Sequence, residues 1–199
     1  MHRHTPRLFE GRSSRFYDLV ARRLLRPVYR RLAADIAGTA PSGAAVLDVG
    51  TGPGVLLVEL ARRRPDLSLT GIDLSADMVG AATRNLRPFG DRATARVADV
   101  ADLPFPDGSF DLVVSSFSSH HWDDPAAAVP HLARVLRPGG RLVIYDFVSA
   151  PFDDLADAAR ERSLFTGAPP ERTPIRTGMP FVPKSVRYVM TAPPLVVAD

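Results

Sequence analysis

The sequence contains no cysteine and no long apolar run. Without cysteine, the chain cannot form a disulfide, a thiolate-ligated zinc or iron–sulfur site, or a thiol nucleophile. No apolar stretch approaches the roughly 20 residues that are needed to cross a bilayer. The first residues of the chain are basic but lack the apolar core of a secretory signal. These absences predict a soluble, cytoplasmic protein.

Lysine is also scarce, since Lys184 is the one lysine among 25 basic residues. The formal net charge is +3, but residues 1–37 hold nine arginines against three acids. A basic segment can mark a nucleic-acid partner, here RNA, or an acidic small molecule. Because arginine replaces lysine throughout the chain, composition bias accounts for the segment as well. We interpret it as a solvated helix face.

The length of 199 residues suits one domain, and residues 44–147 alternate short apolar runs with helical patterns. Strands that alternate with helices indicate an α/β fold with a mostly parallel sheet that is covered on both faces. We expect strands at 45–49, 67–73, 93–98, 110–115 and 141–147, and helices at 54–64, 76–86 and 125–137.

The two ends of the chain depart from this alternation. Residues 12–37 have a helical periodicity that Pro27 should interrupt. Residues 150–184 are rich in proline and lose the alternating pattern, which predicts a functional lid or a mobile segment. After them, Val186–Thr191 and Leu195–Ala198 are expected to form an antiparallel hairpin around two prolines.

Three glycines follow the first predicted strand, in the sequence Val46-Leu-Asp-Val-Gly-Thr-Gly-Pro-Gly54. Glycine allows a tight turn and the close approach of a ligand, and the next helix directs free backbone amides at that ligand. A P-loop would end in Gly-Lys-Ser/Thr, and the dinucleotide pattern needs a small residue where Val55 stands. The loop therefore predicts a ligand other than these two, with a turn that binds nothing as the alternative.

Asp73 ends the second predicted strand, 23 residues after Gly50. A carboxylate at about this spacing accepts hydrogen bonds from the vicinal hydroxyls of a ribose. The same residue is a candidate N-cap for the next helix, although Ser75 suits that position equally well. We interpret Asp73 as a ribose ligand.

Four motifs at fitting intervals resemble those of the class I S-adenosylmethionine-dependent methyltransferases. The motifs are Asp48–Gly54, Gly71–Ser75, Asp99–Asp111 and Arg134–Gly140. The chain looks most like the type 11 small-molecule group, which is related to ubiquinone- and menaquinone-biosynthesis enzymes. The likeness is strong over about 45–147 and weak over 9–37.

The resemblance implies a Rossmann-like, doubly wound sheet within a single methyltransferase domain over 1–199. It divides the chain into an N-terminal helical lid (1–40), a cofactor-binding core (41–149), a substrate-side insertion (150–184) and a terminal hairpin (185–199). The insertion is short for this group. The substrate roof is therefore small, or a second subunit of a homodimer completes it.

The implied cofactor is S-adenosyl-L-methionine, and no metal is implied. The glycine loop would hold its methionine part, Asp73 its ribose, and Leu74 its adenine ring. Because this cofactor lacks phosphates, a loop without Lys or Arg suits it, and nearby acids and carbonyls suit its cationic sulfonium. Tyr17 would cover the cofactor, with packing in the core as the alternative. The implied cofactor residues are Asp48, Gly50, Thr51, Gly52, Gly54, Asp73, Leu74, Met78, Asp99, Val100, Ser116 and Tyr17.

His120 and His121 follow the fourth predicted strand, at the edge of a parallel sheet where ligands bind. Neutral imidazole can take a proton from an acceptor hydroxyl. Both are candidate general bases, with His121 slightly ahead of His120, and the alternative is a pair of packed scaffold residues. We interpret Trp122 as a packing anchor, and Asp124 as the N-cap of a helix that begins at Pro125. Pro130 should kink or shorten that helix.

The predicted function is methyl transfer from S-adenosylmethionine to an O, N or C nucleophile of a small molecule. Two alternatives stay open from the sequence. One is an RNA methyltransferase that uses the arginine-rich N-terminus, and the other is a cofactor-binding module without transfer activity.

Overall fold

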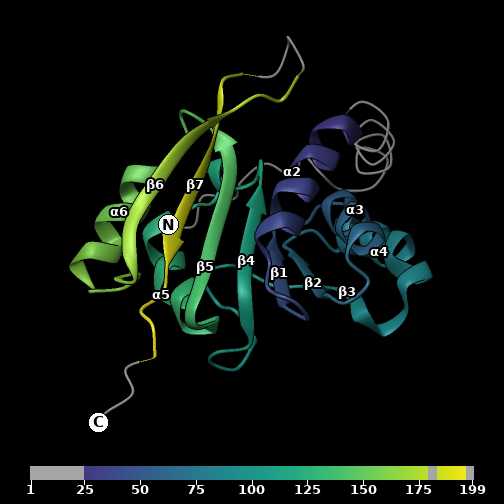
Figure 1. The fold of residues 1–199 in the computed structure, drawn as a ribbon, viewed down its shortest axis with the longest axis horizontal. Coiled ribbons are helices and arrows are strands. Elements are labelled where there is room, and N and C mark those ends of the chain that lie inside the picture. The colour runs from purple at the N-terminus through teal and green to yellow at the C-terminus, as the bar shows by residue number, and fades with distance from the viewer. Residues whose placement is uncertain (1–24, 179–182, 196–199) are drawn as a thin grey trace, which may run out of the picture.

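A single sheet organises the structure, a computed structural model that describes residues 25–178 and 183–195. Its strand order is β3-β2-β1-β4-β5-β7-β6 (Figure 1). Strands β1 to β5 are parallel, and β7 runs antiparallel to both β5 and β6. The predicted α/β class with a mostly parallel sheet is confirmed. The strands are β1 (Ala45–Val49), β2 (Ser68–Asp73), β3 (Ala93–Val97), β4 (Phe110–Ser116), β5 (Leu136–Phe147), β6 (Ala168–Ile175) and β7 (Ser185–Thr191).

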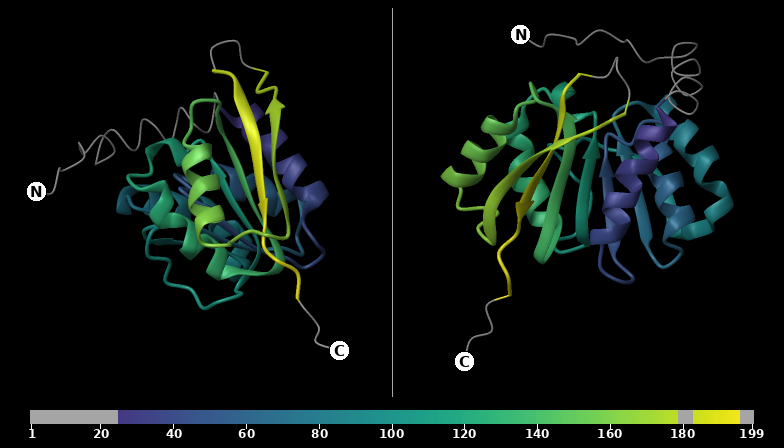
Figure 2. Two further views of the ribbon diagram at one scale, coloured as in Figure 1. Left: turned by 90° about the vertical axis from the view of Figure 1, so that its left-hand side faces the viewer. Right: turned by 45° about the horizontal axis from the view of Figure 1, so that its top comes forward.

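Helices cover both faces of the sheet. One face carries α2 (Arg26–Thr39), α3 (Val55–Arg63) and α4 (Ala76–Leu86), and the other carries α5 (Pro125–Val135) and α6 (Phe152–Glu161). Figure 2 shows α2, in purple, and α6, in green, on opposite sides of the strands. Two short 3-10 turns complete the described elements, η1 (Arg87–Arg92) and η2 (Ser119–His121). None of the described helices combines the length and the apolar composition that a bilayer span requires.

The central strands are apolar on both faces, as expected of strands that helices cover on two sides. Val46 of β1 and Val114 of β4 belong to the core beneath α2, α3 and α4. Their neighbours Leu47 and Val113 belong to the core beneath α5 and α6. All four side chains are fully buried. A shift of one residue would exchange these two sets of side chains, so the two cores fix the strand register.

The helices α4 and α5 begin at the predicted caps. The Ser75 Oγ accepts a hydrogen bond from the Met78 amide at 3.3 Å, and the Asp124 Oδ1 accepts one from the Ala127 amide at 2.9 Å. Each bond satisfies a backbone donor that has no partner within its helix. Asp73 is therefore not the N-cap of α4.

The prolines of α2 and α5 stand where the sequence predicted an interruption and a shortened helix. Pro27 stands in the first turn of α2, where its missing amide costs nothing. Residues 12–24 of the predicted helix lie outside the described residues. The helix α5 continues through Pro130 and ends at Val135, two residues before its predicted end.

The segment after β5 is regular over much of its length, and its last strand corrects the predicted hairpin. Residues 150–184, predicted as a functional lid or a mobile segment, contain the amphipathic helix α6 and the edge strand β6. The predicted strand at Val186–Thr191 is confirmed as β7, whose antiparallel partners are β5 and β6. It does not form a hairpin with Leu195, which has no strand structure, and residues 196–199 lie outside the described part. The prolines of β6 are tolerated because an edge strand leaves one side of its backbone unpaired.

The strand order locates the expected binding site. From β1 the chain passes outward to β2 and β3 on one side, and later to β4 and β5 on the other (Figure 1). Ligands of open parallel sheets bind at such a reversal, beyond the carboxyl ends of the strands. The glycine loop follows β1, and the histidine pair follows β4, so both lie at this point.

Candidate active site

A cavity of about 260 Å³ opens at the carboxyl ends of β1, β2 and β4. Its walls come from the glycine loop, the start of α4, the segment after β4, and Tyr29 of α2. This arrangement brings together residues that are distant in sequence at the predicted ligand position. The cavity is lined by Tyr29, Val49, Gly50, Thr51, Gly52, Pro53, Ile72, Asp73, Leu74, Ser75, Met78, Ala98, Val100, Ser116, Phe117, Ser118, His121 and Trp122.

The glycine loop has a backbone that other residues would strain. Gly50 has a φ of 70°, and a Cβ at this position would overlap the side chain of Ser118 across the cavity. Gly54 has a φ of 75° and precedes the first turn of α3. The Thr51 amide donates to the Ile72 carbonyl at 2.8 Å, which fastens the loop to the end of β2. Glycine is thus required both for the turn and for the close approach of the opposite wall.

Asp48 lies beneath the loop and has no exposed surface. Its Oδ2 accepts a hydrogen bond from the Thr51 hydroxyl at 2.7 Å, while its Oδ1 has no hydrogen-bond partner among the described residues. Burial raises the pKa of Asp48 to about 7; the Thr51 bond opposes this rise, and the nearby Asp73 adds to it. A cationic ligand above the loop would favour the ionised carboxylate.

Asp73 has a structural role as well as a place in the cavity wall. Its Oδ2 accepts from the Gly52 amide and its Oδ1 from the Ser75 amide, both at 2.9 Å. These bonds hold the glycine loop against the start of α4. Burial raises the pKa of Asp73, and the two amides lower it. Each carboxylate oxygen keeps a further lone pair for a ligand hydroxyl.

An apolar surface adjoins Asp73. Leu74 leaves 68% of its surface exposed, which is unusual for a large apolar side chain, and Met78 is buried below it. Val100 and Ser116 also line the cavity. A flat apolar group next to Asp73 would cover the exposed surface of Leu74.

Three of the predicted cofactor residues that the structure describes, Asp48, Gly54 and Asp99, do not line the cavity. Asp99 is exposed, and its Oδ1 accepts from the Ala101 amide at 2.9 Å. The assignment of Asp99 to the cofactor stays a prediction. Tyr17 lies outside the described residues, and Tyr29 of α2 supplies a tyrosine to the cavity instead.

The two histidines have different surroundings. His121 lines the cavity, and burial together with the neighbouring His120 lowers its pKa, while Asp146 acts in the opposite direction. The His120 Nδ1 lies 2.7 Å from the Oδ1 of Asp146, which is the penultimate residue of β5. The two imidazole rings are 4.0 Å apart between their centres.

Asp146 was not among the predicted site residues, and it is completely buried. Besides the His120 ring, it accepts hydrogen bonds from the Ser119 hydroxyl at 2.6 Å and the Phe147 amide at 2.8 Å. Because a carboxylate only accepts hydrogen bonds, it assigns the His120 proton to Nδ1 and leaves Nε2 as an acceptor. The sequence offered one signal, a lone acid at the carboxyl end of a buried strand.

Relatives of this chain are named as methyltransferases. A family model described as "Methyltransferase domain" matches residues 47–144. The demethylmenaquinone methyltransferase of Thermus thermophilus is 39% identical over 141 residues, 68% of this chain and 62% of that protein. The 27-O-demethylrifamycin SV methyltransferase of Amycolatopsis mediterranei is 39% identical over 145 residues, 69% of this chain and 52% of that protein. The chain thus spans between about half and three fifths of the length of these relatives.

The fold is shared with solved structures at lower identity. A SAM-dependent methyltransferase from Aquifex aeolicus superposes with a TM-score of 0.70 at 19% sequence identity. The match covers 92% of this chain and 99% of that protein. The shared architecture includes the sheet whose carboxyl edge carries the cavity.

Proposed function

This chain belongs to the class I S-adenosylmethionine-dependent methyltransferases, and from that premise we propose that it transfers the methyl group of S-adenosylmethionine to a small molecule. The observation that carries the proposal is the cavity that joins the glycine loop, Asp73 and the exposed Leu74 on one side to His121 on the other. One half suits a nucleoside, and the other half places the imidazole of His121 beside it.

The residues of the first half fit this cofactor. Asp73 has free lone pairs for the ribose hydroxyls, and Leu74 presents an apolar surface to the adenine ring. The buried, half-unpaired carboxylate of Asp48 below the loop favours a ligand that carries positive charge. The cofactor supplies a methyl group on a positively charged sulfur, which needs no metal to become a good leaving group. Catalysis can then depend mainly on alignment of the acceptor.

We propose that His120, rather than His121, is the base that takes the proton from the acceptor. Asp146 orients the His120 ring, because its buried carboxylate accepts a hydrogen bond from Nδ1 and leaves Nε2 to accept a proton. His121 has a lowered pKa and serves as a wall of the cavity. A base held in this way is needed when the acceptor must lose a proton, as a hydroxyl, an amine or an activated ring carbon does on methylation.

The relatives narrow the acceptor to a small organic molecule. The names of two of them refer to demethylmenaquinone and to 27-O-demethylrifamycin SV, which are both small-molecule acceptors. RNA is less well supported, because Arg26 and Arg30 of the basic segment are engaged with Glu59 inside the protein.

The experiment is a survey of acceptors with the purified chain and S-adenosylmethionine, in which S-adenosylhomocysteine formation is measured. Phenols, aliphatic alcohols, amines and a short RNA form the panel, and His120→Ala and His121→Ala are compared on any acceptor found. Methylation of a hydroxyl or amine that His120→Ala abolishes would support the assignment. Methylation of RNA alone, or full activity of His120→Ala, would refute it.

A further inference from the structure

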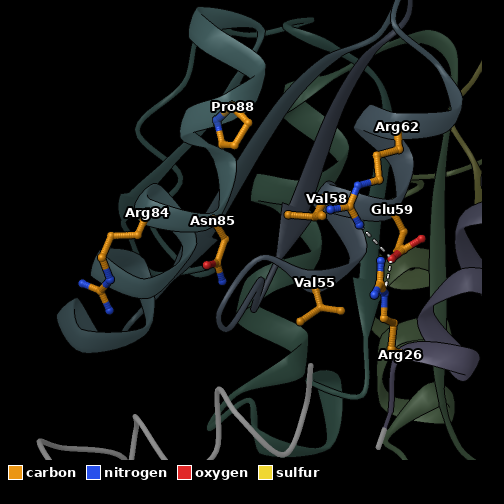
Figure 3. Close-up of a pocket in the computed structure, with 8 residues that line it drawn as sticks. All are labelled: Arg26, Val55, Val58, Glu59, Arg62, Arg84, Asn85 and Pro88. Atoms are coloured by element: carbon orange, nitrogen blue, oxygen red, sulfur yellow. Dashed lines mark hydrogen bonds and ion pairs between the residues drawn. The ribbon is translucent and has the colours of Figure 1, made fainter. Parts of the chain in front are cut away.

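A second hollow, of about 310 Å³, lies outside the active site, between α3, α4 and the first turn of α2 (Figure 3). It shares no lining residue with the cavity described above. Figure 3 shows Arg26, Glu59 and Arg62 on one side of it, and Arg84 and Asn85 on the other. The residues that line it are Arg26, Val55, Val58, Glu59, Arg62, Arg84, Asn85 and Pro88.

Three arginines share one carboxylate at this hollow. Glu59 is buried, and its Oε1 lies 2.8 Å from the Arg26 Nε and 3.3 Å from an Arg62 terminal nitrogen. Its Oε2 lies 3.5 Å from the Arg30 Nε. Burial acts to raise the pKa of Glu59, but the opposing effect of the arginines is larger and the pKa is lowered overall. The carboxylate is therefore ionised at neutral pH. One negative charge therefore faces three positive charges.

The excess positive charge is accessible. The side chains of Arg26 and Arg62 keep 41% and 51% of their surface exposed. On the opposite side, Arg84 has no ion-pair partner among residues 25–178 and 183–195. Each guanidinium offers more donors than its contact with Glu59 uses, so a ligand can bind Arg26 and Arg62 without breaking their ion pairs.

The floor of the hollow is apolar. Val55 is buried, Val58 is half-buried, and Pro88 of η1 stands at the rim. The Asn85 side chain donates to the Pro53 carbonyl at 2.8 Å, which fixes the wall of α4 to the glycine loop. The site therefore offers a rigid apolar surface between two groups of cations.

We propose that this hollow is a second binding site, which takes a small organic phosphate. Guanidinium groups bind phosphoryl oxygens in pairs, and a dianion balances the local excess of positive charge. The phosphoryl group would lie between the Arg26–Arg62 side and Arg84, with the organic part on Val55, Val58 and Pro88. A monocarboxylate would leave part of the charge unbalanced. The site does not depend on the methyl-transfer assignment, because none of its residues lines the active-site cavity.

The experiment is calorimetric titration of the full chain with phenyl phosphate, which combines a phosphoryl dianion and a flat apolar group. Arg62→Gln and Arg84→Gln remove one charge each from opposite sides and should each weaken binding about tenfold. Arg63→Gln is the matched control, because Arg63 neighbours Arg62 on α3 but does not line the hollow. It should change the affinity less than about twofold.

Several outcomes would overturn the proposal. One is the absence of saturable phenyl phosphate binding, and another is an equal loss in Arg63→Gln, which would indicate a diffuse charge effect. Tighter binding of a short RNA than of phenyl phosphate, lost in Arg62→Gln and Arg84→Gln, would assign the surface to nucleic acid instead. S-adenosylhomocysteine affinity is measured on the same samples, and an unchanged value shows that a variant is folded. A failure of this site is thereby distinguished from a failure of the proposed function.

Discussion

Ionisation of Asp48 should make the stability of this protein fall as the pH rises. The carboxylate is fully buried, and its pKa in the folded protein is raised from 3.8 to about 7. The folded state therefore holds this proton more tightly than the unfolded chain does. The contribution of protonated Asp48 to the unfolding free energy is greatest below the pKa of the unfolded chain, and it is lost as the pH rises through about 7.

The size of the effect follows from the two pKa values. Each unit of difference corresponds to about 1.4 kcal/mol, so the full difference is about 4 kcal/mol. Between pH 5 and pH 8 the part that is lost is about 2.5 kcal/mol of unfolding free energy. Asp48→Asn keeps an oxygen for the Thr51 hydroxyl but cannot ionise in this range.

The measurement is urea unfolding of the parent and Asp48→Asn at pH 5 and pH 8. The unfolding free energy of the parent, minus that of the variant, should fall by about 2.5 kcal/mol over this range. The other groups with shifted pKa values, Asp73 and His121 among them, are present in both proteins and largely cancel in the difference. A difference that stays constant with pH would show that Asp48 is ionised throughout, and the account of its burial would be wrong.

Further substitutions test the two walls of the active site. Asp146→Asn should lower kcat about a hundredfold, because the His120 ring loses the partner that fixes its tautomer; a parent-like kcat would refute the dyad. Gly50→Ala should destabilise the protein by at least about 1–2 kcal/mol and abolish S-adenosylhomocysteine binding. The added Cβ would overlap Ser118, and the φ of this residue is positive. Parent-like thermal unfolding and affinity would contradict this. Asp99→Ala should weaken S-adenosylhomocysteine binding by much less than Asp73→Ala, as water can replace a single exposed acceptor; an equal loss in calorimetry would place Asp99 on the cofactor.

Local sequence was sufficient to place the glycine loop and Asp73 at the cavity. The loop at Gly50 and Asp73 at the end of β2 are each specified by a strand, a turn and a helix that are contiguous in the chain. Asp146 is different, because it reaches His120 only through the pairing of β4 with β5, in which Ser116 is aligned with Tyr145. No spacing rule in the sequence predicts that contact across 26 residues.

The C-terminal part of the fold was harder to predict for a related reason. The strand β6 was not predicted because it contains three prolines, and proline is normally evidence against a strand. Proline is tolerated in a strand only at the edge of the sheet. The edge position is a property of the assembled sheet and not of residues 168–175 themselves. The strand β7 was predicted correctly because its apolar pattern is local, but its partners were not.

The most direct test of the central claim is calorimetric titration of the full chain with S-adenosylmethionine and S-adenosylhomocysteine, with NAD as the control nucleotide. We expect one site per chain for both sulfur ligands and a tenfold to hundredfold weaker affinity in Asp73→Ala, which corresponds to about 1.5–3 kcal/mol for a lost charged acceptor. Binding of NAD without heat from either sulfur ligand would contradict the account, as would an Asp73→Ala variant that binds S-adenosylhomocysteine as tightly as the parent.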